Sequence, residues 1–158
     1  MPTTTAYPFV VRPTINYSNL SKKILMAPDV LLRKLLYLRQ LLADLAPYQN
    51  ATLTEVEAEH YKLERLVELL VATATDILFH KLAEMDVAPD SYRDAFRLAG
   101  EHDLLPVDLA ERMQQAAGMR NILVHLYETI DYQILHDSIQ PALRDFSQFA
   151  AIFAEDLE

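Results

Sequence analysis

The sequence predicts an all-α fold, an up-down helical bundle of four to five helices. The chain has 158 residues, 51% of them hydrophobic, which is enough for one domain with a buried core. It contains only two glycines, and its long stretches rich in Leu, Ala and Glu favour helix over sheet. Apolar residues recur at spacings of three and four, which is typical of helices that pack on one face.

Residues 1–25 are expected to form an extended N-terminal arm, with room for one short strand, ahead of a helical domain at 26–158. The arm contains three prolines and several threonines, and clusters of these residue types are typical of loops. The first periodic apolar stripe starts after Met26. The bundle is therefore expected to fold without the arm.

The first helix is expected from Asp29 to about Leu45, because leucines repeat there at helical spacing: Leu31, Leu35, Leu38, Leu42 and Leu45. Pro47 and Asn50 end it. Residues 52–55 have the form of a capping box, with a hydroxyl at the cap and a carboxylate three residues later. They are expected to start one long helix that continues to about Met85 and packs antiparallel to the first.

The sequence predicts three further helices, at about 91–100, 106–129 and 131–156. Ser91 and Asp131 are residue types that cap helix N-termini, and each precedes one of these segments. Pro106 suits the first turn of the middle helix. Pro141 is expected to kink the last one.

The helix at 106–129 carries the segment that is most informative about function. At about 100° per residue, its residues separate into a polar arc and an apolar stripe that is expected to face the core. The stripe contains Met119, Ile122, Leu123, Leu126 and Ile130. The polar arc gathers residue types of recognition and proton transfer, which are Arg120, Asn121, His125 and Tyr127. The alternative interpretation is a surface helix with a mixed polar face.

This segment resembles the Arg-x4-His-x-Tyr motif of the HEPN superfamily, and in particular that of HepT-like toxins from bacterial toxin–antitoxin pairs. All four positions of the motif match: Arg120, the polar Asn121, His125 and Tyr127. The resemblance extends over residues 26–158, and it includes Asp76 and the segments at 61–65, 91–94 and 130–131.

The resemblance implies the toxin of a type VII-like toxin–antitoxin pair, a dimeric ribonuclease that needs no metal ion. It also implies that a partner nucleotidyltransferase antitoxin transfers AMP to Tyr127. The side chains suit such chemistry: His125 can act as acid or base near neutral pH, and Arg120 can hold phosphate oxygens. Asn121 can orient the imidazole or contact phosphate. One histidine cannot readily be both acid and base, which favours a composite site across a homodimer interface.

Asp76 and His80 lie four residues apart and so share a helix face. Asp76 is expected to support the site by orienting His125 or Arg120, and Tyr127 to support it by donating a hydrogen bond to phosphate. The alternative for the Asp76–His80 pair is a structural role in the bundle interior.

The net charge of −9 argues against a broad nucleic-acid binder, but it is compatible with an RNA-cleaving enzyme that has local positive potential. The chain has no cysteine and no His-Glu-x-x-His-like spacing, so neither a metal nor another cofactor is expected. It also lacks a long apolar run and a secretory signal, which predicts a cytoplasmic protein without a membrane partner. Two alternatives stay open: a non-catalytic HEPN adaptor that binds a nucleotide or a nucleotidyltransferase, and a structural dimerisation module.

Overall fold

The structure is a computed structural model that describes residues 28–124 and 131–158. Its helices are α1 (Pro28–Leu45), α2 (Leu53–Ala58), α3 (His60–Ala83), α4 (Tyr92–Glu101), α5 (Val107–Val124) and α6 (Tyr132–Ala154), with short 3₁₀ turns η2 (Ala46–Tyr48) and η3 (Glu155–Leu157). The predicted arm at 1–25 and the motif residues His125 and Tyr127 lie outside the described residues.

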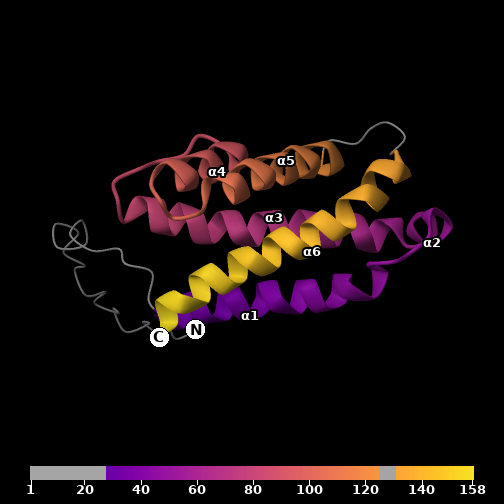
Figure 1. The fold of residues 1–158 in the computed structure, drawn as a ribbon, viewed down its shortest axis with the longest axis horizontal. Coiled ribbons are helices and arrows are strands. Elements are labelled where there is room, and N and C mark those ends of the chain that lie inside the picture. The colour runs from indigo at the N-terminus through magenta and orange to yellow at the C-terminus, as the bar shows by residue number, and fades with distance from the viewer. Residues whose placement is uncertain (1–27, 125–130) are drawn as a thin grey trace, which may run out of the picture.

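The helices form the predicted up-down bundle. Figure 1 shows α3 between α1 and the pair α4 and α5, with α6 running diagonally across the bundle from the end of α5 to the start of α1. Both α1 and α6 contact α3, and α4 contacts α3 as well as α5. The start of α1 and the end of α6 lie at the same end of the bundle (Figure 1). None of the described helices is both long and apolar enough to cross a membrane.

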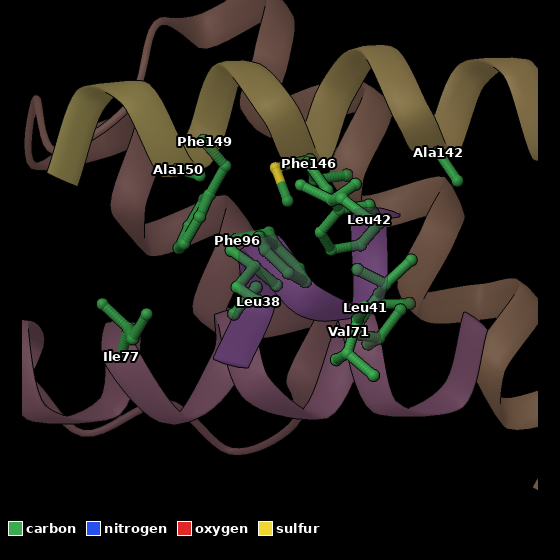
Figure 2. Close-up of a cluster of buried hydrophobic side chains, with 14 of the residues drawn as sticks. Leu38, Leu41, Leu42, Val71, Ile77, Phe96, Ala142, Phe146, Phe149 and Ala150 are labelled. Atoms are coloured by element: carbon green, nitrogen blue, oxygen red, sulfur yellow. The ribbon is translucent and has the colours of Figure 1, made fainter. Parts of the chain in front are cut away.

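The core forms where α1, α3, α4 and α6 meet. All five leucines predicted to face the core from α1 are buried. Figure 2 shows one of them, Leu38, in a cluster with Phe96 of α4 and Phe146 of α6. Burial of a side chain of this size contributes about 1.5–3 kcal/mol. These buried side chains therefore join α1, α4 and α6 in one hydrophobic core.

The single long helix predicted after the capping box is divided in two. The capping box itself is confirmed, because Thr52 accepts from the Glu55 amide and the Glu55 carboxylate accepts from the Thr52 amide. The helix is interrupted at Glu59, whose backbone (φ −110°, ψ 18°) leaves the helical region. Val56 of α2 is fully buried, and α2 contacts α6. Packing against a distant helix thus accompanies a break that the local sequence pattern did not indicate.

The two other predicted caps are confirmed. The Ser91 hydroxyl accepts from the Asp94 amide at the start of α4, and the Asp131 carboxylate accepts from the Gln133 amide at the start of α6. Pro141 lies inside α6, which continues past it. The caps satisfy amide groups that the first turn of a helix leaves without partners.

Helices α4 and α5 approach each other closely near the turn that joins them. A Cβ atom added to Gly100 of α4 would lie 2.8 Å from the Cβ of Ala110 in α5. The turn between them contains Asp103 in a left-handed conformation (φ 59°), and the Leu104 amide donates to the carbonyl of Ala99. This close packing sets the start of α4 beside the later turns of α5, where Arg120 lies.

Candidate functional site

Arg120 lies near the end of α5, on the face that carries the buried residues of this helix. It follows Met113 by seven residues and Ala117 by three, and both of these side chains are fully buried. The Arg120 side chain is accordingly half-buried, and its Nε atom is buried. Its guanidinium carbon lies 4.5 Å from the centroid of the Tyr92 ring at the start of α4.

The orientation predicted for this segment, with Arg120 opposite a core-facing apolar stripe, is confirmed only in part. Met119 and Leu123 of the stripe are partly buried and pack against the core, but Ile122 is 56% exposed and Arg120 is itself half-buried. Leu126 and Ile130 lie outside the described residues. The core face of α5 is set by earlier residues, among them Leu109, Met113 and Ala117, which are fully buried. These residues precede the segment 119–131, which by itself does not show the core face of the whole helix.

The contact with Tyr92 holds the Arg120 guanidinium against an aromatic ring. A cation–π contact of this kind contributes about 0.5–2 kcal/mol and leaves the in-plane N–H donors available. One of them, Nη1, lies 3.5 Å from the Asn121 Oδ1 atom, at the limit of a hydrogen bond.

The Nε atom of Arg120 finds no acceptor among the residues that the structure describes. A buried donor without an acceptor costs about 1–3 kcal/mol.

A hydrogen-bonded turn fixes Tyr92 at the start of α4. The Asp94 carboxylate accepts from the backbone amide of Asp90 at 3.0 Å and from Arg97 at 2.6 and 2.9 Å. The bond from the Asp90 amide, followed by that from Arg97, lowers the pKa of Asp94 below its ordinary value. Together with the Ser91 cap, these bonds hold the turn that presents the Tyr92 ring to α5.

The structure places Asp76 opposite Lys34 of α1. Its carboxylate accepts a hydrogen bond from the Lys34 ammonium, and Nε2 of His80 lies 4.0 Å from the other carboxylate oxygen. The distance to His80 is too long for a hydrogen bond. The role predicted for Asp76, orienting Arg120 or His125, stays a prediction.

Asp76 and Tyr92 line the same surface groove, which has a volume of about 500 Å³. Its other lining residues are Arg33, Lys34 and Tyr37 from α1 and Ala72 and Thr73 from α3. Tyr92 therefore contacts Arg120 and also forms part of the groove wall. Sequence reasoning matched the 91–94 segment to HepT-like proteins but gave Tyr92 no role, and it found no signal for Lys34 or Tyr37. These side chains meet only because three helices converge.

Among the described residues, no group of three or more His, Asp or Glu side chains is placed to hold a metal ion. Arg120 and Asn121, the two predicted catalytic residues that the structure describes, come just before residues 125–130 in the chain. The described part of the site thus supplies a cation, an amide and an aromatic ring.

Comparison with known proteins agrees with the helical arrangement and with the motif. The family described as ribonuclease HepT-like matches residues 34–152. The mRNA nuclease HepT of Shewanella oneidensis is 36% identical over 61 residues, which cover 39% of this chain and 46% of that protein. The tRNA nuclease HepT of Aphanizomenon flos-aquae is 34% identical over 85 residues, covering 52% of this chain and 57% of that protein. The chain thus matches about half the length of these curated relatives.

Solved structures show the same fold. One is a toxin–antitoxin complex with AMP-PNP, with a TM-score of 0.72 and 20% identity. Another is a tri-AMPylated HEPN toxin of Shewanella oneidensis in complex with MNT antitoxin, with a TM-score of 0.72 and 21% identity. Each similarity covers 80% of this chain and 98% of the chain compared.

Proposed function

Because this chain belongs to the HepT-like family, we propose that it is an endoribonuclease and the toxin of a toxin–antitoxin pair. The observation that carries the proposal is the position of Arg120, held on the Tyr92 ring with a buried Nε donor. A guanidinium held in this way is suited to bind a phosphate group. In the Arg-x4-His-x-Tyr motif, His125 and Tyr127 follow Arg120 by five and seven residues.

The proposed reaction needs no metal ion. The 2′-oxygen of RNA attacks the adjacent phosphorus while the bond to the 5′-oxygen breaks, leaving a 2′,3′-cyclic phosphate and a free 5′-hydroxyl. His125 removes the proton of the 2′-hydroxyl or delivers one to the leaving 5′-oxygen. Arg120 stabilises the negative charge on the phosphoryl oxygens, and Asn121 orients the imidazole or the phosphate.

The proposed site is shared between two copies of the chain. One imidazole cannot readily act as base and acid in the same step, so a second His125 from a two-fold partner would supply the missing role. Two copies of Arg120 would then raise the local positive potential in a cleft, although each chain carries a net charge of −9.

We further propose that the antitoxin is a nucleotidyltransferase that switches the enzyme off by transferring AMP to Tyr127. The two solved structures described above are toxin–antitoxin complexes, and one of those toxins is AMPylated. The transfer adds a phosphate charge and a large base to a residue of the motif segment. The tethered phosphate competes with RNA for Arg120.

The direct test is to incubate the purified chain with RNA in the presence of EDTA and to identify the product ends. We expect cleavage with cyclic phosphate ends, and its loss in both Arg120→Ala and His125→Ala. Arg39→Ala, which removes an exposed arginine of α1, serves as the control and should cleave normally. Full cleavage by Arg120→Ala or His125→Ala would refute the proposal. An intact chain that binds a nucleotide or a nucleotidyltransferase without cleaving RNA would favour the adaptor.

A further inference from the structure

We propose that the groove between α1, α3 and α4 holds one unpaired nucleotide of the RNA, next to the phosphate bound by Arg120. This inference rests on the proposed ribonuclease function and names the form of RNA that the site accepts. The groove is connected to the site through Tyr92, whose ring contacts the Arg120 guanidinium and also lines the groove. A strand held by Arg120 therefore passes the mouth of the groove.

Tyr37 supplies an aromatic surface for a base. Its side chain is 45% exposed and lines the groove. It follows Arg33 by four residues, so the two lie on one face of α1. An exposed aromatic ring beside a cation is the combination by which proteins bind single-stranded nucleic acid, with the base on the ring and the phosphate on the cation.

The charges of the groove suit a nucleotide better than those of the whole chain. Arg33 donates to the backbone carbonyl and to the carboxylate of Asp29, each at 3.4 Å, and its side chain is 72% exposed. Surface pairs of this kind contribute little and are readily exchanged for another anion. The groove and its edge contain three cations, Arg33, Lys34 and Arg120, and two carboxylates, Asp29 and Asp76. The local charge is therefore positive, whereas the chain as a whole has a net charge of −9.

The ion pair of Lys34 and Asp76 provides hydrogen-bond donors and acceptors for the edge of a nucleotide base. The Lys34 ammonium has three donors and the Asp76 carboxylate is 48% exposed, so each retains capacity beyond their mutual bond. A base in a duplex has its Watson–Crick edge occupied, whereas an unpaired base can turn that edge toward such a pair. The groove is accordingly expected to select single-stranded RNA.

The test measures RNA binding by the full-length chain with His125→Ala, which keeps the RNA intact. The probe is a short fluorescein-labelled single-stranded RNA, and its fluorescence anisotropy is followed at several salt concentrations. We expect an added Tyr37→Ala to weaken binding about tenfold, because it removes one stacked base, and Tyr37→Phe to restore it. Tyr61→Ala, which removes a tyrosine that is 80% exposed on α3 outside the groove, is the matched control and should have no effect.

Salt dependence separates a phosphate contact from a structural role. Arg33→Gln should reduce the slope of log affinity against log salt by about 0.7, the value for one phosphate contact on a single strand. Arg39→Gln changes an exposed arginine of the same helix that does not line the groove, and it should leave the slope unchanged.

Equal RNA affinity of Tyr37→Ala and Tyr61→Ala would overturn the groove proposal, as would a failure of the His125→Ala chain to bind RNA at low salt. Duplex RNA that binds as tightly as the single strand would also refute it. If Tyr37→Ala weakens only the capture of the purified cognate antitoxin, the groove is a protein-docking site instead. RNA cleavage by the unmodified chain is measured separately. If the unmodified chain cleaves RNA but Tyr37→Ala does not weaken binding, the groove proposal is wrong and the ribonuclease proposal stands. If the unmodified chain binds RNA without cleaving it, the ribonuclease proposal is wrong.

Discussion

The two glycines of the chain lie in neighbouring helices and allow a matched test of how tightly α4 packs on α5. Gly100 lies in α4 and Gly118 in α5. Replacing a helical glycine with alanine favours the helix by roughly 0.5–1 kcal/mol, because alanine loses less backbone entropy on folding. In the absence of new contacts, both Gly100→Ala and Gly118→Ala would therefore be more stable than the unmodified chain.

The structure predicts that the two substitutions differ. The new methyl group at position 100 would lie 2.8 Å from the Ala110 Cβ, well inside the optimal carbon–carbon separation of about 3.5–4.0 Å. The Ala110 Cβ is attached directly to the backbone, so α4 and α5 must move apart, at a cost of about 1–3 kcal/mol. At Gly118 the methyl group meets nothing within 4 Å among the described residues. The helix-propensity gain cancels in the comparison, and the difference between the variants is the steric cost of about 1–3 kcal/mol.

Urea unfolding followed by circular dichroism, at one protein concentration for all variants, measures this difference. Thermal unfolding gives a second reading, since 1 kcal/mol shifts the Tm by about 2–4 °C in a domain of this size. Gly100→Ala should also reduce RNA cleavage, because α4 carries Tyr92 and α5 carries Arg120. A Gly100→Ala variant as stable as Gly118→Ala would refute the reasoning, since the two helices would then separate without cost.

Three further predictions concern the site and its pH dependence. Tyr92→Leu should lower the kcat for RNA cleavage by more than tenfold with little change in helical content. Tyr92→Phe keeps the aromatic ring against Arg120 and should retain activity. Equal kcat values for the two variants would exclude a positioning role for the Tyr92 ring. Co-expression with the cognate antitoxin should add AMP to the Tyr127 peptide, detected by mass spectrometry, and Tyr127→Phe should escape neutralisation; adducts on other tyrosines alone would contradict this. The hydrogen bond to Asp137, followed by that to the Ala51 carbonyl, raises the pKa of His136 above 6.5. Protonated His136 should therefore stabilise the fold fully below pH 6.5, and this stabilisation should be lost as the pH rises through the folded-state pKa of His136. Because the pKa of Asp137 is lowered, protonation of Asp137 should remove the stabilisation only at acid pH, below 3.8. The Tm difference between the unmodified chain and His136→Gln should shrink as the pH is raised, and a difference that grows would refute the assignment.

The sequence by itself determined the helical architecture, because helix formation depends on interactions a few residues apart. The caps at Thr52, Ser91 and Asp131 satisfy amides within three residues of each cap, and the leucine stripe of α1 follows from a period of about 3.6 residues. The motif that begins at Arg120 was visible in the sequence through its resemblance to HepT-like proteins, and the family match agrees with that resemblance.

Only the tertiary structure decided which way Arg120 points and what surrounds it. Its ring partner, Tyr92, lies 28 residues earlier in the chain, and the partner of Asp76, Lys34, lies 42 residues earlier. The break at Glu59 accompanies contact between α2 and α6. No local pattern encodes such pairings, because they depend on the close approach of whole helices, such as the one that Gly100 allows. The groove beside the site arises for the same physical reason, since residues of three helices line it.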